Sequence, residues 1–243
     1  MRVDGRSTSQ LRPIRIVPNF LKYATGSALI EVGETKVLCS VTVEENLPSW
    51  MRNERGQKGW LTAEYSMLPG ATQTRSKRER SHLGGRTQEI QRLIGRALRA
   101  VLDLSKCPDL TFLVDCDVIQ ADGGTRTAAI NGSFVALSLA CKRLLKSGKL
   151  KQDPIREGLA ATSVGLVGGQ IVLDLNYSED SQADLDMNVV LTHSGKIIEL
   201  QGSAERSAFS REEVIAIIDL VGENVQSIAD LQRLALEGRI VES

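Results

Sequence analysis

Histidine, cysteine and aromatic residues are all scarce in this 243-residue chain. It has two histidines, His82 and His193, and its aromatic content is 4%. Two histidines offer little material for a histidine-built zinc site or a Ser-His-Asp triad. The four cysteines are scattered, with no Cys-x-x-Cys pair, which is typical of reduced thiols in the cytosol. We therefore expect a cytoplasmic protein with Cys116 and Cys141 in its core.

Several sequence features that would assign a class are also missing. No apolar run approaches the ~20 residues that a membrane helix needs, so we expect no membrane partner. The start, Met-Arg-Val-Asp-Gly-Arg, lacks the apolar core of a signal peptide. Neither a Walker loop nor a Gly-x-Gly-x-x-Gly fingerprint is present, so ordinary nucleotide-binding folds are not indicated. A hydrophobic content of 42% with 25% charged residues is ordinary for a globular protein of one large or two small domains.

Charge is balanced in total but uneven along the chain. Thirty basic and thirty acidic residues give a net charge of zero, which by itself predicts no nucleic-acid partner. Residues 75–99, however, are strongly basic, with eight cations against Glu79 and Glu89. Acidic residues gather later, at 179–186 and near the C-terminus. This distribution fits a polyanion on one face and a cation on another, and two solvated faces would give the same pattern.

Hydrophobic periodicity predicts both strands and helices, which fits an α/β protein. Strands are expected at residues 27–32, 35–43, 61–67, 111–119, 159–167, 170–175, 188–192 and 196–201. Helices are expected at residues 86–102, 125–146 and 211–237, the last after the capping box Ser210-Arg-Glu-Glu213. Residues 1–14 read as an irregular arm, and 71–85 form a cationic loop too long for a tight connection. We predict a single domain over residues 1–243, built from halves at about 10–146 and 158–240.

The turn between the strand at 111–119 and the helix at 125–146 is a candidate anion site. Gly123 and Gly124 let the backbone approach a ligand closely, and the following amides lie at a helix N-terminus, which favours an anion. Thr125 adds a hydroxyl, and Arg126 adds a forked cation suited to phosphate. A tight turn with a solvated Arg126 would show the same local pattern.

Arginines on the helix at 86–102 are candidates for contacting a phosphate backbone. Arg92, Arg96 and Arg99 share a face that differs from the apolar stripe, and their binding would be salt-sensitive. The alternative is a solvated helix face. The preceding loop, which carries further arginines, favours RNA contact. These loop arginines are Arg75, Arg78 and Arg80.

Three aspartates near residue 180 form a candidate cation site. Asp184 and Asp186 share strand parity, and Asp180 can fold back beside them from the preceding turn. Carboxylates placed together repel one another unless a proton or cation intervenes, and Mg²⁺ prefers such oxygen ligands together with substrate phosphate and water. A polar turn with a capping aspartate is the alternative.

Six stretches together resemble the ribonuclease PH family of phosphorolytic exoribonucleases over nearly the whole chain. They are residues 2–6 (RVDGR), 10–12 (QLR), 56–65 (GQKGWLTAEY), 84–94 (GGRTQEIQRLI), 115–128 (DCDVIQADGGTRTA) and 179–188 (EDSQADLDMN). The resemblance implies a ribosomal-protein-S5-domain-2-like fold that assembles into a hexameric ring, a trimer of dimers. The duplicated core and trailing RNA-binding modules of polynucleotide phosphorylase, a relative of this family, have no room in this chain.

The resemblance also implies site roles. A phosphate site would comprise Arg86, Gly124, Thr125 and Arg126. Asp180 and Asp186 would be the catalytic acidic pair and would hold Mg²⁺ or Mn²⁺; whether either is a general acid or only a metal ligand is open. The loop of residues 75–80 would contact tRNA.

The implied activity is phosphate-dependent 3′→5′ trimming of tRNA precursors, and of other RNA 3′ ends such as those of rRNA. Inorganic phosphate would be the co-substrate, nucleoside 5′-diphosphates the products, and nucleotide addition the reverse reaction. One alternative is a catalytic or structural RNA-binding subunit of an exosome-like ring. Another is a hydrolytic two-metal nuclease, for which the chain has few clustered carboxylates.

Overall fold

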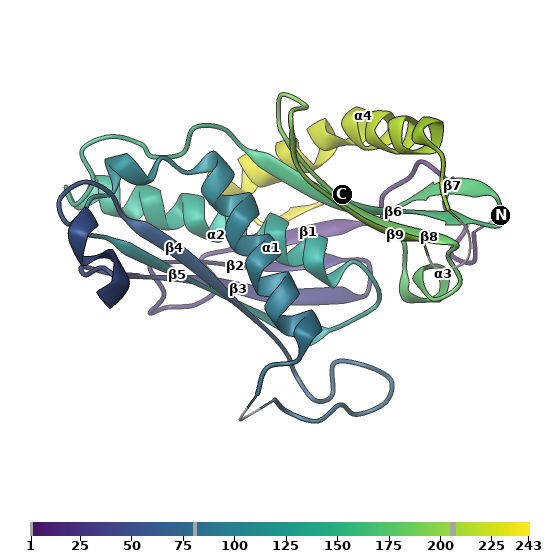
Figure 1. Cartoon of the computed structure of the whole chain (residues 1–243), viewed down its shortest axis with the longest axis horizontal. Helices are drawn as coiled ribbons and strands as arrows, with labels where there is room; N and C mark the ends of the chain where they lie inside the picture. The colour runs from purple at the N-terminus through teal and green to yellow at the C-terminus, as the bar shows by residue number, and fades with distance from the viewer. Residues whose placement is uncertain (1, 80–81, 205–207) are drawn as a thin grey trace.

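Two β-sheets and three long helices make up the described part of the protein (Figure 1). The computed structural model describes residues 2–79, 82–204 and 208–243. Helices α1 (Gly85–Val101) and α2 (Thr125–Lys146) cover one face of the first sheet, and α4 (Arg211–Leu236) covers the second. Short helices are α3 (Tyr177–Asp180), η1 (Ser49–Glu54) and η2 (Leu104–Lys106). The expectation of a mixed α/β fold is confirmed.

The first sheet has, within the described residues, the strand order β10-β1-β2-β3-β5-β4. Its strands are β1 (Ile14–Pro18), β2 (Gly26–Val32), β3 (Thr35–Glu44), β4 (Trp60–Met67), β5 (Thr111–Gln120) and β10 (Val241–Glu242). Strands β4 and β5 are parallel, because α1 carries the chain back across the sheet between them. The remaining neighbours in this sheet are antiparallel.

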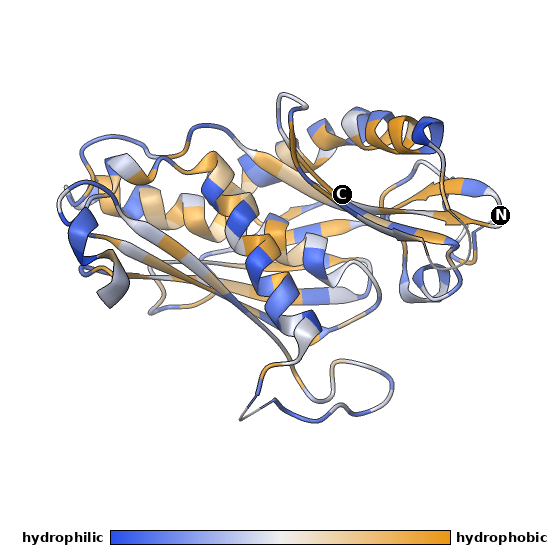
Figure 2. Ribbon diagram, in the orientation of Figure 1, coloured by the Kyte–Doolittle hydropathy of each residue, from blue (hydrophilic) through white to orange (hydrophobic). Residues whose placement is uncertain are grey.

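The second sheet is antiparallel throughout its described strands, in the order β7-β6-β8-β9. Its strands are β6 (Leu159–Val167), β7 (Gln170–Leu173), β8 (Leu185–Thr192) and β9 (Ile197–Ala204). Both sheets contribute to one hydrophobic cluster, which includes Ile30, Phe112 and Val189. Figure 2 shows the apolar residues concentrated where helices and sheets face each other.

Helix α2 lies at the centre of this core. It packs against β2 and β3 of the first sheet and β6 of the second, so nearly every face of it is covered. Within the described residues, α2 is the one helix long and apolar enough to span a membrane, yet 78% of its most apolar window is buried in the fold. Burial on several sides accounts for a helix that is apolar all round.

Most predicted elements are confirmed to within a few residues, and α2 matches at both ends. Two strands were missed. Strand β1 starts at Ile14, where an irregular arm was expected to end, and β10 at the C-terminus pairs with it. The strand predicted to reach residue 175 ends at Leu173, because Asp174 takes a left-handed backbone with φ of 53°. The division into two halves stays a prediction. All four cysteines are buried and unpaired.

Candidate active site

The turn from β5 into α2 is built on two glycines in the left-handed region. Gly123 has φ of 72° and Gly124 has φ of 64°. A Cβ atom on Gly123 would lie 2.6 Å from the carbonyl oxygen of Leu175 and 2.8 Å from the amide nitrogen of Tyr177. Glycine is therefore required at position 123 both for its conformation and for space.

The N-terminus of α2 suits an anion. Gly124 is its N-cap, the first turn carries no acidic residue, and no described side chain caps it with a hydrogen bond. The first regular helical bond is donated by the Ala128 amide to the Gly124 carbonyl, at 3.0 Å. The amides before Ala128 therefore point out of the helix end, where the helix dipole also favours negative charge.

Tyr65 links this helix end to the two arginines. Its hydroxyl lies 2.9 Å from Thr125 Oγ1. Burial raises the pKa of the Tyr65 hydroxyl, while the hydrogen bond to Thr125 and the positive charges of Arg86 and Arg126 oppose that rise. Arg86 at the start of α1 and Arg126 at the start of α2 thus act on the same hydroxyl. Arg86 lies at the start of α1, and Gly124, Thr125 and Arg126 lie at the start of α2; their phosphate-binding role stays a prediction.

Arg126 forms an ion pair with Glu89, a residue that the sequence analysis had not proposed for the site. Its Nη2 lies 3.4 Å from Glu89 Oε2, and Glu89 Oε1 accepts a 2.7 Å hydrogen bond from Gln201 on β9. Within the described residues, Arg126 Nε and Gln201 Oε1 are buried without a hydrogen-bond partner. Unpaired buried polar atoms are costly, so a ligand or water at this place would lower the free energy. Glu89 lies one helical turn after Arg86, and this spacing is the signal that could have identified it.

The acidic segment follows the expected alternation. Asp184 and Asp186 are half-buried, and Leu185 between them is buried, so the two aspartates share the face opposite Leu185. Asp186 lies in β8, across from Gly165 of β6 and Ser203 of β9.

Asp180 is the last residue of α3, beside the start of β8 (Figure 1). The carbonyl of Asp180 accepts a hydrogen bond from the Ala183 amide, which turns the chain toward β8.

This acidic segment adjoins the glycine turn directly. The Tyr177 amide donates a 3.3 Å hydrogen bond to Asp122 Oδ1, and Gly123 packs against residues 175–177. The predicted phosphate site and the helix that carries Asp180 are therefore neighbours, although more than 50 residues separate them in sequence.

The donor set fits a hard cation that shares its ligands with a substrate. Within the described residues, no group of three or more His, Cys, Asp or Glu side chains could hold a metal. This excludes a closed structural zinc site in the described part of the chain. A pair of carboxylates is what Mg²⁺ uses when phosphate oxygens and water complete its octahedron. Asp180 and Asp186 are the residues that would hold it.

The cationic loop between β4 and α1 protrudes from the molecule below the start of α1 (Figure 1). Arg75 and Arg78 are exposed on it, and Arg80 lies outside the described residues. Burial raises the pKa of the Asp117 carboxyl on β5, and the positive charge of Arg78 opposes that rise.

The three arginines on α1 have different surroundings. Arg96 is bound by Glu199 through two hydrogen bonds of 2.6 and 3.0 Å. Arg99 donates to the Leu61 carbonyl at 3.0 Å and its guanidinium lies 5.0 Å from the centre of the Trp60 ring. Arg92 is exposed. Arg96 and Arg99 thus have structural partners within the chain, and the RNA-binding role of all three stays a prediction.

A mixed α/β core that sets a cationic helix end beside an acidic segment fits the class of enzymes that act on phosphate esters. Within that class the assignment is specific: the chain belongs to the 3′ exoribonuclease family. Domain 1 of that family matches residues 10–142 and domain 2 matches residues 159–221. The resemblance noted in the sequence is confirmed.

Curated relatives are similar over almost their whole length. The chain is 53% identical to a ribonuclease PH of Moorella thermoacetica over 97% of this chain and 94% of that protein. It is 54% identical to a ribonuclease PH of Bacillus cereus over 97% of both.

Solved structures with the same fold are more distant in sequence. Rice (Oryza sativa) Rrp46 superposes with a TM-score of 0.79 at 24% identity, covering 97% of this chain and 100% of that one. An Archaeoglobus fulgidus exosome with RNA bound to its active site superposes with a TM-score of 0.80 at 21% identity, covering 94% of this chain and 91% of that one. These structures establish the fold.

Proposed function

We propose that this protein is a phosphate-dependent 3′→5′ exoribonuclease that trims the 3′ ends of tRNA precursors. The observation that carries the proposal is the N-terminus of α2, which has no acidic residue in its first turn and carries Arg126, whose buried Nε has no hydrogen-bond partner among the described residues. Family membership and the similarity to ribonucleases PH support it.

In this proposal inorganic phosphate binds between the two arginines and the amides that follow Gly124. Phosphate at neutral pH is already an anionic nucleophile, so the scarcity of histidine is no obstacle. The protein's contribution is to position the nucleophile and neutralise charge, which is how enzymes accelerate phosphoryl transfer in general. The orphaned Nε of Arg126 is a donor that a phosphate oxygen would satisfy.

The reaction balances without a further co-reactant. A phosphate oxygen forms a bond to the phosphorus of the last phosphodiester, and the bond from that phosphorus to the 3′-oxygen breaks. The products are a nucleoside 5′-diphosphate and an RNA shortened by one nucleotide, whose 3′-oxygen takes a proton. One phosphate ester is exchanged for one diphosphate bond, so the reaction is reversible and diphosphates support nucleotide addition.

Asp180 and Asp186 are proposed to face the scissile phosphate. A bound Mg²⁺ or Mn²⁺ would offset negative charge on the phosphate and on the leaving oxygen. Either aspartate could instead deliver the proton to the 3′-oxygen, and the reaction's dependence on pH would distinguish these roles.

RNA is proposed to reach this site along the basic surface. Arg75 and Arg78 on the exposed loop, with Arg80 beside them in sequence, are its contacts, together with Arg92, Arg96 and Arg99 of α1. A homohexameric ring, a trimer of dimers, would present several such loops to one RNA and so increase its effective concentration.

The test is the chemistry of the product. The purified protein is incubated with Mg²⁺ and an RNA carrying a few extra 3′ nucleotides, with and without inorganic phosphate, and the released mononucleotides are identified. We expect nucleoside diphosphates that require phosphate. Monophosphates formed without phosphate would establish hydrolysis and refute the proposal. Size measurement of the same sample tests the hexamer, since an exosome-like subunit would need partner chains.

A further inference from the structure

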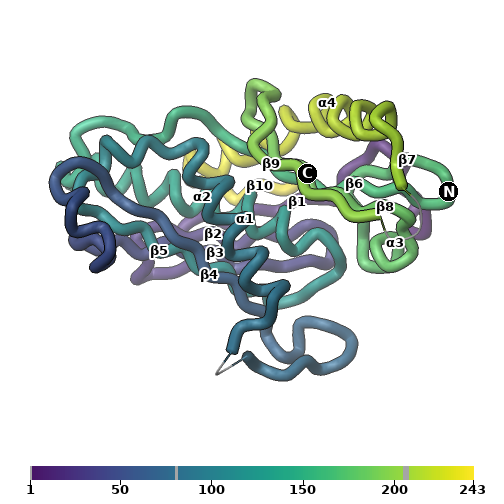
Figure 3. Tube along the Cα trace, viewed as in Figure 1, coloured from purple at the N-terminus to yellow at the C-terminus, as the bar shows by residue number. Residues whose placement is uncertain are grey.

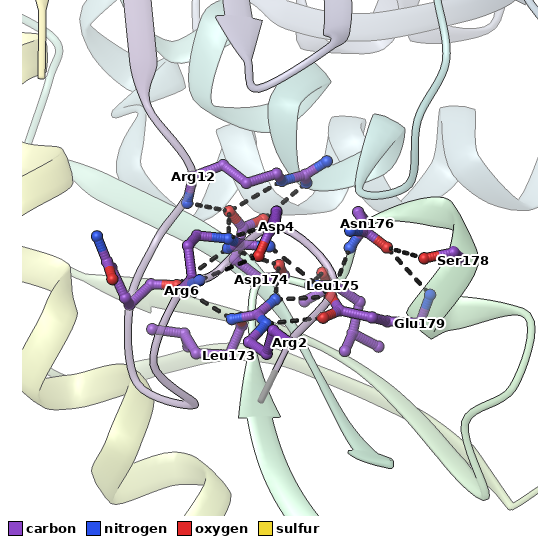
Figure 4. Close-up of polar contacts among 12 residues, drawn as sticks. Arg2, Asp4, Arg6, Arg12, Leu173, Asp174, Leu175, Asn176, Ser178 and Glu179 are labelled. Carbon is purple, nitrogen blue, oxygen red and sulfur yellow. Dashed lines mark hydrogen bonds and ion pairs between the residues drawn. The ribbon is translucent and has the colours of Figure 1, made fainter.

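The N-terminal arm, expected to be irregular, inserts three arginines into the protein. The side chains of Arg2, Arg6 and Arg12 are only 5%, 7% and 4% exposed. They meet two equally buried carboxylates, Asp174 and Glu179, from the second half of the chain (Figure 4). We call these five residues the arm cluster. Figure 3 shows the arm running beside β7 and α3.

Arg2 holds the start of α3. Its guanidinium forms a fork on Glu179, with Nε to Oε1 and Nη2 to Oε2 both 2.7 Å. It also donates to the carbonyls of Leu173 and Asp174, each at 2.9 Å. Glu179 in turn completes a capping box with Asn176. A four-residue helix has no stability of its own, so these bonds determine where α3 lies.

The residue after Glu179 is Asp180, one of the proposed catalytic pair. Its amide donates a 2.9 Å hydrogen bond to the Asn176 carbonyl, within the same turn of helix. Any displacement of Glu179 therefore displaces Asp180.

Arg12 holds the other side of the site. It makes a second fork on Asp174, with Nε to Oδ2 3.0 Å and Nη2 to Oδ1 2.7 Å. Its Nη1 donates to the Asp122 carbonyl at 2.5 Å. Asp122 immediately precedes Gly123, and a Cβ on Gly124 would lie 2.7 Å from Arg12 Nη2. Arg12 thus fixes the turn on which the proposed phosphate site is built.

Arg6 lies between the two forks. Its Nη1 donates to the Asp174 carbonyl at 3.1 Å, and its guanidinium lies 3.5 Å from the Asp174 carboxylate and 3.7 Å from that of Glu179. Asp4 binds Arg6 Nε at 2.7 Å, so three arginines face three carboxylates.

Buried ion pairs of this kind add little net stability over apolar packing, because desolvation offsets the attraction. Their bidentate geometry instead fixes distances and angles closely. These hydrogen bonds join the glycine turn to α3 through side chains that take no part in the proposed chemistry.

We propose that the arm cluster is a positioning device, which sets the distance between the phosphate-binding turn and Asp180. This inference rests on the proposed function. The two forks have separable effects. Loss of the Arg2–Glu179 fork shifts Asp180 and lowers kcat with little effect on the KM for phosphate. Loss of the Arg12–Asp174 fork shifts the turn and raises the KM for phosphate.

The experiment compares Arg2→Gln, Arg2→Lys, Glu179→Gln and Arg12→Lys with a matched control, Arg15→Gln. Arg15 lies on β1 just after the arm, and its ion pair with Glu31 of β2, at 3.3 Å, involves neither α3 nor the glycine turn. Hydrogen exchange is measured over residues 173–182 without substrate, and kcat and the KM for phosphate are measured separately with a short RNA.

We expect faster exchange over residues 173–182 in Arg2→Gln and Glu179→Gln and unchanged exchange in the control. The kcat of Arg2→Gln and Glu179→Gln should fall ~10–100-fold, the range seen when groups that orient a ligand are removed. Their KM for phosphate should stay within about twofold of the wild-type value. Arg2→Lys keeps the charge but loses the fork, so its kcat should lie in between. Arg12→Lys should instead raise the KM for phosphate.

Two results would overturn the proposal. The first is that Arg2→Gln and Glu179→Gln show faster hydrogen exchange in α3 but have the same kcat as the control Arg15→Gln. The other is a parallel loss of kcat and phosphate affinity that follows only the fall in melting temperature, which would make the cluster merely structural. Should Arg2→Gln and Glu179→Gln fail to fold, Arg2→Lys decides by the same criteria. A failure of the proposed function is distinct, since the wild-type chain would then release no diphosphates.

Discussion

Glu89 on α1 and Arg126 on α2 face each other with 3.4 Å between Oε2 and Nη2. The carboxylate orients the arginine and at the same time competes with phosphate for it. Gln201 holds the other oxygen of Glu89, so the carboxylate cannot swing away freely. A substitution in this pair changes both the orientation of Arg126 and the competition with phosphate. Separate measurement of kcat and of the KM for phosphate distinguishes the two effects.

Glu89→Gln should strengthen phosphate binding. The repulsion between two unit negative charges ~4 Å apart in water is ~1 kcal/mol, so removing the charge of Glu89 should raise the affinity for phosphate about fivefold. The KM for phosphate should fall accordingly, and kcat should also fall because Arg126 is less well oriented. Glu212→Gln, the same change at an exposed position of α4, is the control. A raised KM for phosphate would show that orientation outweighs competition.

Arg126→Ala should abolish phosphorolysis. Removal of one donor to a developing charge typically lowers kcat by about 10²–10³-fold, and Arg126 also binds the nucleophile. RNA affinity, measured by filter binding without phosphate, should be nearly unchanged. Unaltered turnover at saturating phosphate would remove Arg126 from the mechanism.

Gly123→Ala should damage the phosphate site more than its backbone cost explains. An alanine in the left-handed region costs ~1–2 kcal/mol, and its Cβ would also press on the Leu175 carbonyl. Gly168→Ala is a matched control, since Gly168 has φ of 56° but no described atom within 4 Å of the added Cβ. Both variants should lose similar stability from the backbone, and only Gly123→Ala should raise the KM for phosphate. Equal KM values would separate the turn from phosphate binding.

Neutralising Arg75, Arg78 and Arg80 should weaken tRNA binding and flatten its salt dependence. Each lost phosphate contact lowers the slope of log K against log salt by ~0.7–0.9, so the total change should be about 2–3. Neutralising three exposed lysines elsewhere, Lys146, Lys151 and Lys196, is the control. An identical slope in both triple variants would mean that the loop is only solvated.

Glu179 should make the protein's stability sensitive to acid. Burial alone would raise the pKa of its carboxyl, but hydrogen bonds from Arg2 and the Asn176 amide outweigh burial, so the pKa lies below the ordinary value of 4.5. A lowered folded-state pKa contributes stability above the unfolded value, and that stability is lost as pH falls through the folded value. Arg6 faces the same carboxylate; the other acids nearby are Asp174 of the arm cluster and Asp4, which binds Arg6.

Urea unfolding of the wild type and of Glu179→Gln, repeated from pH 7 down to about pH 3, measures this effect. The wild type should be more stable at neutral pH, and the gap should shrink once the pH drops below 4.5. A constant gap would show that Glu179 acts through shape alone.

The sequence by itself determined most of the local structure. The apolar spacing of Ile90, Leu93 and Ile94 places α1, and the glycine pair before Thr125 marks the start of α2. Such signals depend on residues two to four positions apart, where backbone geometry dictates which side chains share a face. Of the residues in the proposed phosphate site, Gly124, Thr125 and Arg126 could be named from the glycine turn, whereas Arg86 was named only through the family resemblance.

Only the tertiary structure decided which distant groups meet. Arg2 and Glu179 lie 177 positions apart, and no local spacing indicates that they form a fork. The same holds for Glu89 with Gln201 and for β10 on the edge of β1. A charged side chain on an irregular segment carries no periodicity, so the sequence pattern does not indicate where the arm packs. Its burial follows from the carboxylates that the second half of the chain places there, and these partners exist only once the two halves pack together.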